Sequence, residues 1–551
     1  MKKSCLLNSL SNPIFPIQTQ FCFIHLTIQE FLAARHVTEK LAPPEIKKFI
    51  SDHVGSGRWH LVLQFIAGLL GKKIEMFKYK DCVSAFAESI KVTHGEIKLN
   101  YNQVFAMTCL MEVDNGKIAK EVCETTALND VVRLDNDNYR ASPSEMVAVS
   151  FFCEHMKNLA SLKLEPTNAG SAEEVLELLQ KRCIKQLELR GFIGLLNREH
   201  VFSALIKLNC TLNHEHTKLT SLKLPTCLIT ERELPNMWMF FKNGHASHLE
   251  ELYLYHSADL FGISKLYEAL NNDNCTELTC LYLPCTILEY EEASVLFDTL
   301  TKGLWKLTKL DVTACGLRDQ CIPTLVKALQ DERCQLTVLL LEKNDIGDEG
   351  ACMLFEDALT KEHCKLTVLN LRMCWLTDQC IPSLCKALQD ERCQLTHLAL
   401  GDNDIGNKGA CMLFNHALTK EHCKLTKLDL SSCLLRSCCI FSLCKALQDE
   451  RCQLTDVRLD WNGIGDDDAC MLFEDALTKE HCKLAELNLS SCCLTDRCIP
   501  SLCKALQDER CKLTKLRVSL NQFTGKGKML LDDVQEYPSC KSRGLLLKTG
   551  W

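Results

Sequence analysis

The sequence has no excess of basic charge and no long apolar run, and each absence excludes a class of protein. Its 551 residues include 63 Lys and Arg against 71 Asp and Glu, which gives a formal net charge of −8. A dedicated nucleic-acid-binding protein normally shows a basic face, so we expect no nucleic-acid partner. The longest apolar run, residues 61–70, is interrupted by Gln64 and is about half a membrane span long, so we expect no transmembrane helix.

Patterns for nucleotide, metal and catalytic sites are also missing. A Walker A loop, G-x-x-x-x-G-K-[ST], cradles phosphates with backbone donors and a lysine, and no segment has that spacing. A C-x-x-C pair, typical of a zinc site, is absent as well. No nucleophile-and-base set is identifiable. We therefore predict no catalytic residues, no metal and no cofactor, and a protein that is not an enzyme.

Cysteine, by contrast, is abundant, with 36 residues. Many of these cysteines recur at regular intervals, each two residues before an apolar segment, at Cys334, Cys364, Cys393, Cys423, Cys452, Cys482 and Cys511. A thiol in that register behaves as a small buried hydrophobe. We interpret these cysteines as reduced and structural, which is typical of a cytoplasmic protein.

The chain repeats itself every 59 residues, and each unit holds two copies of the motif L-x-x-(L/V)-x-(L/V)-x-x-(Cys/Asn). The regular copies begin at Leu307, Leu336, Leu366, Leu395, Leu425, Leu454, Leu484 and Leu513. Their ninth position alternates between Cys and Asn, as in Cys374 and Asn403. A repeat of this period with this strand motif defines a leucine-rich-repeat solenoid.

Each repeat predicts one strand and one helix. Ile381, Leu384, Cys385 and Leu388 have the i, i+3, i+4, i+7 spacing of one helix face, which we expect to pack on the following strand. The predicted fold class is α/β: a leucine-rich-repeat horseshoe with parallel strands inside and helices outside, preceded by an α-helical domain. The ninth-position Asn or Cys should satisfy backbone polar groups where the chain leaves the strand.

Looser copies of the motif precede the regular ones and predict five further strands, with starts at Leu159, Ile184, Leu219, Leu249 and Leu278. Helical patterns dominate before them, and one helix should begin with Ser142 as its cap and Pro143 in its first turn. We therefore divide the chain into five parts. They are an unassigned leader (1–20), the end of a winged-helix-like region (21–41), a helical domain (42–155), leucine-rich repeats (156–537) and a tail (538–551).

Two N-terminal segments carry a family resemblance. Residues 21–34, FCFIHLTIQEFLAA, resemble the end of the winged-helix region in NACHT-type, leucine-rich-repeat innate immune receptors. Residues 59–70, WHLVLQFIAGLL, resemble the helical domain that follows it in the same receptors. The alternating Cys and Asn of the repeats resemble ribonuclease-inhibitor-type leucine-rich repeats. The chain thus looks like the C-terminal part of such a receptor, either as a truncated gene model or as a genuine short form.

The resemblance implies a role for one residue. In these receptors the histidine that matches His25 contacts the phosphates of bound ADP. Because the rest of that pocket is missing, we expect His25 to bind ATP or ADP only in a longer form that has a NACHT domain. In this chain a packed residue on an amphipathic element is the favoured interpretation of His25.

The repeats differ most where their strands should face the concave surface. The helix segment CKALQDERC occurs three times unchanged, whereas the third and fifth motif positions and those just beyond the strands vary from copy to copy. We predict a ligand-binding surface from these variable positions: Arg372, Trp375, His397, Asp402, Lys427, Asp429, Asp456, Arg458, Asp460, Trp461, Glu486 and Arg517. The alternative is that exposed positions simply tolerate drift.

These observations predict a non-catalytic, ligand-sensing module of a cytoplasmic, NLR-like innate immune receptor that lacks the nucleotide-binding core. Its partner would be a protein ligand or another domain of the same receptor. The alternative is a stand-alone inhibitor or scaffold of the ribonuclease-inhibitor type, in which the horseshoe wraps a protein partner.

Overall fold

The structure is a computed structural model of the whole chain. It describes residues 7–10, 20–23, 26–73, 79–90, 97–98, 100–125, 131–134, 142–156, 161–164, 186–189, 219–224, 239–242, 247–254, 275–302 and 306–549. The chain divides into two compact units, Met1–Cys227 and Leu228–Trp551, here called unit 1 and unit 2.

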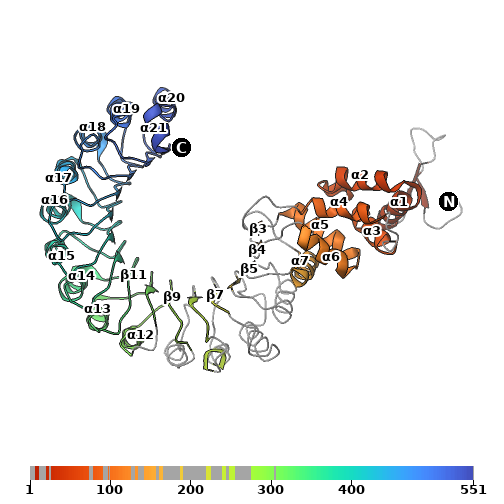
Figure 1. Ribbon diagram of the computed structural model, residues 1–551, viewed down its shortest axis with the longest axis horizontal. Helices are drawn as coiled ribbons and strands as arrows, with labels where there is room; N and C mark the ends of the chain where they lie inside the picture. Colours follow the sequence, from red (N-terminus) through yellow and green to blue (C-terminus); the bar gives the residue numbers. More distant parts are fainter. Residues whose placement is uncertain are drawn as a thin grey trace. The chain divides into compact units, whose positions relative to one another are not determined.

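Unit 1 is mainly helical before its repeats begin (Figure 1). Its described helices are α1 (Leu26–Lys40), α2 (Pro43–His53), α3 (His60–Gly71), α4 (Lys80–Glu88), α5 (Tyr101–Glu112), α6 (Gly116–Thr125) and α7 (Pro143–His155). Ile46, Ile50, Phe86 and Phe152 are among its fully buried side chains. Near the N-terminus, β1 (Leu7–Leu10) pairs antiparallel with β2 (Gln20–Phe23), so part of the predicted unassigned leader has regular structure.

The start of α7 matches its sequence pattern. The Ser142 side chain accepts a hydrogen bond from the Glu145 backbone N–H, and the Glu145 carboxylate accepts one from the Ser142 backbone N–H at 2.7 Å. Pro143 occupies the first turn, where its missing N–H leaves no bond unmade. The predicted cap of this helix is confirmed.

Parallel strands begin earlier than residue 156, the boundary that the sequence suggests. In unit 1, β3 (Ile97–Lys98), β4 (Val131–Leu134), β5 (Ser161–Leu164), β6 (Gln186–Leu189) and β7 (Ser221–Leu224) pair in sequence order, all parallel. The first two strands lie within the predicted helical domain of residues 42–155. Their segments lack the motif's leucine at position one, so their sequence gives no leucine-rich-repeat signal.

Unit 2 is a curved stack of repeats, with strands along its inner side and helices along its outer side (Figure 1). Its strands are β8 (Glu251–Leu254), β9 (Cys280–Tyr282), β10 (Lys309–Asp311), β11 (Val338–Leu340), β12 (Val368–Asn370), β13 (His397–Ala399), β14 (Lys427–Asp429), β15 (Asp456–Arg458), β16 (Glu486–Asn488), β17 (Lys515–Arg517) and β18 (Leu546–Lys548). Every motif start predicted from the sequence is followed by a strand, so the predicted solenoid fold class is confirmed.

The helices of unit 2 cover one side of this stack. The α-helices that can be bounded among its described residues are α12 (Tyr290–Leu300), α13 (Ile322–Leu329), α14 (Gly347–Met353), α15 (Ile381–Leu388), α16 (Gly406–His416), α17 (Ser437–Gln448), α18 (Gly465–Met471), α19 (Ile499–Gln507), α20 (Gly525–Val534) and α21 (Pro538–Arg543). Their apolar faces, such as Ile381, Leu384 and Leu388, are buried against the strands. This packing agrees with the predicted helix face.

The ninth-position residues tie consecutive repeats together. Asn403 accepts hydrogen bonds from the backbone N–H groups of Cys374 and Leu376 at 2.9 and 3.0 Å. Its side-chain amide donates to the carbonyl oxygens of Leu371 and Leu400 at 2.8 and 2.9 Å. In the intervening repeats a thiol takes this place, and the Cys374 Sγ donates to the Leu341 carbonyl at 3.1 Å. The expected backbone-satisfying role is confirmed.

The periodic cysteines before the strands are buried in the stack. Cys364 and Cys423 are each 4% exposed, and burial raises the pKa of each thiol to about 11. The described cysteines form no disulfides. This burial agrees with their interpretation as small structural hydrophobes.

The last residues also extend the stack, so the predicted tail at residues 538–551 is wrong as a separate segment. Strand β18 pairs parallel with β17, and Leu547 lies opposite Leu516. Cys540 and Leu547 are buried. In the register of this pairing the first motif position falls on Gly544 instead of a leucine, so the motif search misses this strand.

Candidate functional site

The strands of unit 2 present alternate side chains to two different environments. In β13 the central Leu398 is 2% exposed, whereas His397 and Ala399 on either side are partly exposed. The same alternation holds in β11, β12, β16 and β17. The central residues face the helices, so the third and fifth motif positions line the concave face, as the sequence predicts.

A hollow lies in this concave face, centred on β13. Its volume is about 240 Å³, and it is open to solvent. Ala399 makes room for it, because the fifth motif position carries larger side chains on the neighbouring strands. Five predicted site residues line the hollow together: His397, Lys427, Asp429, Asp456 and Arg458.

The basic side chains of the hollow are freer to bind a ligand than its acidic side chains. Lys427 and Arg458 are exposed, and neither forms an ion pair within the described part of the chain. Burial and the nearby Glu486 raise the pKa of Asp456. Burial and the nearby Lys427 lower the pKa of His397, so this imidazole tends to stay neutral. The hollow therefore offers two unpaired cationic side chains to a ligand.

The Arg372 guanidinium is not free to bind a ligand in this way, because it reaches across the next two repeats and is bonded to their side chains. Its guanidinium donates to Asp429 Oδ2 at 2.6 Å, to Ser431 Oγ at 2.9 Å, and to Asp402. The crossing passes over Gly401, where an added Cβ would lie 2.6 Å from Ser431 Oγ and 3.0 Å from Arg372 Nη1. Three predicted ligand-binding residues thus form an internal clamp, which we call the Arg372 clamp.

Other predicted site residues are also engaged within the sheet. Lys515 Nζ lies 2.5 Å from Glu486 Oε2, and this hydrogen bond lowers the pKa of Glu486. Asp460 accepts a hydrogen bond from Asn488 at 2.7 Å, and burial raises its pKa. Arg517 lies on β17 in register with Asn488 and Lys548.

Both predicted tryptophans lie on the loops that leave the strands. Trp375 is 76% exposed and Trp461 is 63% exposed. The sequence analysis missed Met373, Leu434 and Leu520, which are exposed at equivalent loop positions. The motif numbering could have found them, since Leu434 shares the tenth position with Trp375, and Leu520 shares the eighth with Trp461.

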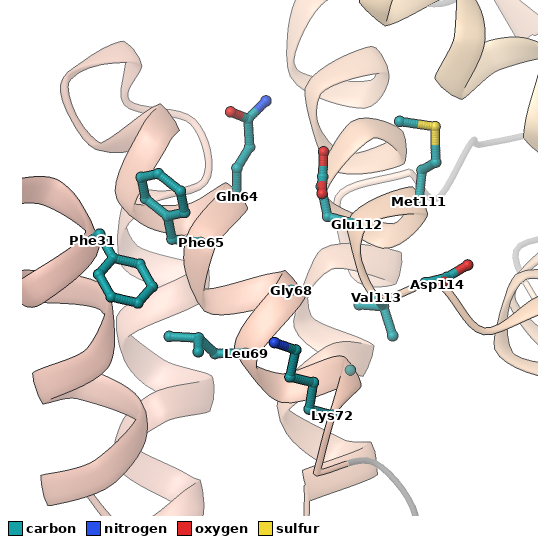
Figure 2. A pocket seen from close by; sticks show the side chains of 11 residues that line it. Phe31, Gln64, Phe65, Gly68, Leu69, Lys72, Met111, Glu112, Val113 and Asp114 are labelled. Carbon is teal, nitrogen blue, oxygen red and sulfur yellow. The ribbon is translucent and has the colours of Figure 1, made fainter. Parts of the chain in front are cut away.

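Unit 1 holds a separate pocket that the sequence does not predict (Figure 2). Its volume is about 610 Å³, and it lies along α3. Phe31 and Phe65 form one wall with their ring centroids 5.5 Å apart, and Glu112 lies across α3 from them (Figure 2). The end of α5 approaches α3 so closely that a Cβ on Gly71 would lie 2.3 Å from the Val113 carbonyl oxygen.

Three further features concern a nucleotide contact, metal-binding groups and membrane spans. His25 lies outside the described residues, so its expected phosphate role stays a prediction. Within the described ranges, no group of three or more His, Cys, Asp or Glu side chains is arranged to hold a metal ion. No helix in the same ranges is long and apolar enough to cross a membrane.

Comparisons with known proteins agree with this architecture. The family model described as "Leucine Rich repeat" matches residues 334–355 and 393–414. The chain is 26% identical over 442 residues to NACHT, LRR and PYD domains-containing protein 14 of Homo sapiens, covering 71% of the chain and 39% of that protein. It is 32% identical over 277 residues to protein 3 of the same series in Bos taurus, covering 50% of the chain and 26% of that protein. It is 23% identical over 547 residues to protein 4E in Mus musculus, covering 95% of the chain and 51% of that protein.

The stacked parallel strands, the repeated motif and the matching family model define a leucine-rich-repeat protein. Within that class, the chain is similar in sequence to the NACHT, LRR and PYD domains-containing proteins. It spans about half or less of the length of these relatives.

Proposed function

We propose that unit 2 is a non-catalytic protein-binding module of a cytoplasmic, NLR-like innate immune receptor. The hollow on β13 is the observation that carries this proposal. It brings five of the predicted site residues together and includes two exposed cations without ion-pair partners. Lys427 and Arg458 come from neighbouring strands, so one acidic or polar partner surface can reach both.

Several features support the other parts of this proposal. The buried thiols fit a reducing compartment. No segment of the given sequence has Walker A spacing, and the proposed binding role invokes no nucleotide hydrolysis. The ligand is either a separate protein or another domain of the receptor. It would act by binding one arrangement of the receptor better than another, which shifts their populations.

The test compares the proteins captured by two double variants of the full chain. K427A/R458A removes both free cations of the hollow. K386A/K504A is the matched control, since it removes two exposed lysines from the outer helices α15 and α19. Each variant and the wild type are immunoprecipitated from the same cells, and the captured proteins are quantified by mass spectrometry.

We expect at least one protein to bind the wild type and the control equally and to fall at least tenfold with K427A/R458A. Unfolding midpoints within 1 °C of each other would show that the fold is intact, because exposed substitutions usually change stability little. Identical sets of captured proteins for all three chains would contradict the proposed role of the hollow.

A further inference from the structure

An exposed apolar row follows the loops at the carboxyl ends of the strands of unit 2. It consists of Met373, Trp375, Leu434, Trp461 and Leu520, here called the apolar rim, and each of these side chains is more than half exposed. The strands are parallel, so their carboxyl ends share one edge of the sheet. Large apolar side chains that stay exposed at recurring positions along one edge mark a candidate interaction site.

Neither packing nor backbone preference explains why the positions of the apolar rim carry large apolar side chains. Trp375 and Leu434 have φ of 59° and 58°, in the left-handed region where a side chain is disfavoured. The equivalent residue two repeats earlier is Gly316, with φ of 71°. Glycine therefore fits the same backbone turn, and the large exposed side chains add strain without burying themselves. Their presence points to contact with something outside the chain.

Two unpaired acids indicate the chemistry of that contact. Asp345 and Asp404 occupy the tenth motif position in the repeats on either side of Trp375, and both are exposed. The Asp404 N–H donates to the Leu376 carbonyl at 2.8 Å, which holds this acid beside the Trp375 loop. Neither carboxylate forms an ion pair among the described residues, although Arg318 is bridged to Asp345 through the backbone. An indole between two free carboxylates suits a cationic side chain, which the ring face also attracts.

We propose that the apolar rim, with Asp345 and Asp404, binds a protein segment in which an arginine or lysine is flanked by apolar residues. The cation lies on Trp375 between the two acids, and the neighbouring apolar side chains contact Leu434 and Trp461. This inference rests on the proposed protein-binding function and adds a second contact, separate from the hollow.

The length of the apolar rim fits an extended segment. Neighbouring strands lie about 4.8 Å apart, so the five strand steps from Met373 to Leu520 span on the order of 25 Å. An extended chain advances roughly 3.3 Å per residue and covers this length with about seven or eight residues. Trp375 and Leu434 belong to repeats two steps apart, at a spacing of about 10 Å.

The test uses a phage-displayed library of random 12-residue peptides and the full chain. Peptides are selected on the wild type and counter-selected on D345N/D404N. Enriched peptides are synthesised, and their dissociation constants are measured by fluorescence anisotropy. The panel is the wild type, D345N/D404N, W375G, the hollow variant K427A/R458A and the outer-face control K386A/K504A. Unfolding midpoints check the fold, and W375G should not lower the midpoint, because glycine suits the left-handed backbone.

We expect the enriched peptides to carry at least one Arg or Lys next to apolar residues. Their affinity should fall at least tenfold with W375G and with D345N/D404N, and should fall when the salt concentration is raised. It should stay within twofold for K427A/R458A and for K386A/K504A.

Three results would overturn the proposal: no enrichment, enriched peptides without basic residues, or equal affinity for the wild type and the W375G variant. Binding lost only in K427A/R458A would also overturn it while supporting the hollow. A rim-dependent peptide together with an unchanged set of proteins captured by K427A/R458A would instead count against the hollow alone.

Discussion

At the scale of single residues, the ninth motif position does the most to hold the repeats together. Asn403 is 4% exposed and joins backbone groups of its own repeat and of the preceding one. Asn344 and Asn462 make equivalent bonds. Each of these amides satisfies donors and acceptors that the turn leaves without partners in its own repeat, and leaving such groups unsatisfied when buried is costly.

Replacing Asn403 with alanine should therefore destabilise unit 2 strongly. N403A leaves two amide N–H groups and two carbonyl contacts unmade, and we expect a loss of about 3 kcal/mol or more in the free energy of unfolding. N415A is the control, because this exposed asparagine on α16 makes a single side-chain bond, to Ser442, and should cost less than about 1 kcal/mol. Equal costs in urea unfolding would refute the role assigned to the ninth position.

The sequence predicts where the site residues lie better than what they touch. Motif numbering correctly places His397, Lys427 and Arg458 on the concave face, because side chains alternate along a strand. It does not reveal that Arg372 is engaged by Asp402 and Asp429. That contact depends on how far each repeat is displaced from the next, which only the assembled stack shows. It also depends on the absence of a side chain at Gly401.

At the scale of elements, strands with the full motif were predictable and those without it were not. Strands β3, β4 and β18 pair in the same parallel manner as the others, but their segments lack the leading leucine of the motif. A segment without the full motif can still form a strand when it lies beside a strand that is already formed, because that neighbour supplies its backbone hydrogen bonds. The pocket along α3 depends on helix packing and carries no sequence signal.

The Arg372 clamp gives a prediction about coupling between three successive strands. G401A should displace the guanidinium, because the added Cβ would lie 3.0 Å from Arg372 Nη1. We expect it to cost about 1–3 kcal/mol, the value of a charge-assisted hydrogen bond. R372A should cost a similar amount.

A double-mutant cycle measured by urea unfolding checks this coupling. Because both substitutions break the same contacts, R372A combined with G401A should cost less than the sum of the two single changes. Strictly additive costs would show that Gly401 and Arg372 act independently.

At the scale of the whole molecule, unit 2 is a scaffold whose repeats share their core and differ in what they expose. The buried leucines, thiols and asparagines recur with the period of the repeat, so the stack grows by nearest-neighbour contacts. The hollow and the apolar rim arise where exposed residues depart from that repetition, at Ala399, Trp375 and Leu434. Both features lie on the strand side of the stack or at its loop edge, so we expect the outer helices to stay free of ligand and to serve as the reference surface.

Hydroxyl-radical footprinting of the full chain tests this division most directly, with and without a selected peptide or a captured protein bound. Phe441 on α17 and Met529 on α20 are exposed on the outer helices and serve as internal references. We predict that a ligand lowers the oxidation rates of Trp375, Leu434 and Trp461 at least threefold and leaves Phe441 and Met529 unchanged. Protection of Phe441 and Met529 with full oxidation of the tryptophans would contradict the assignment of binding to the concave face and its rim.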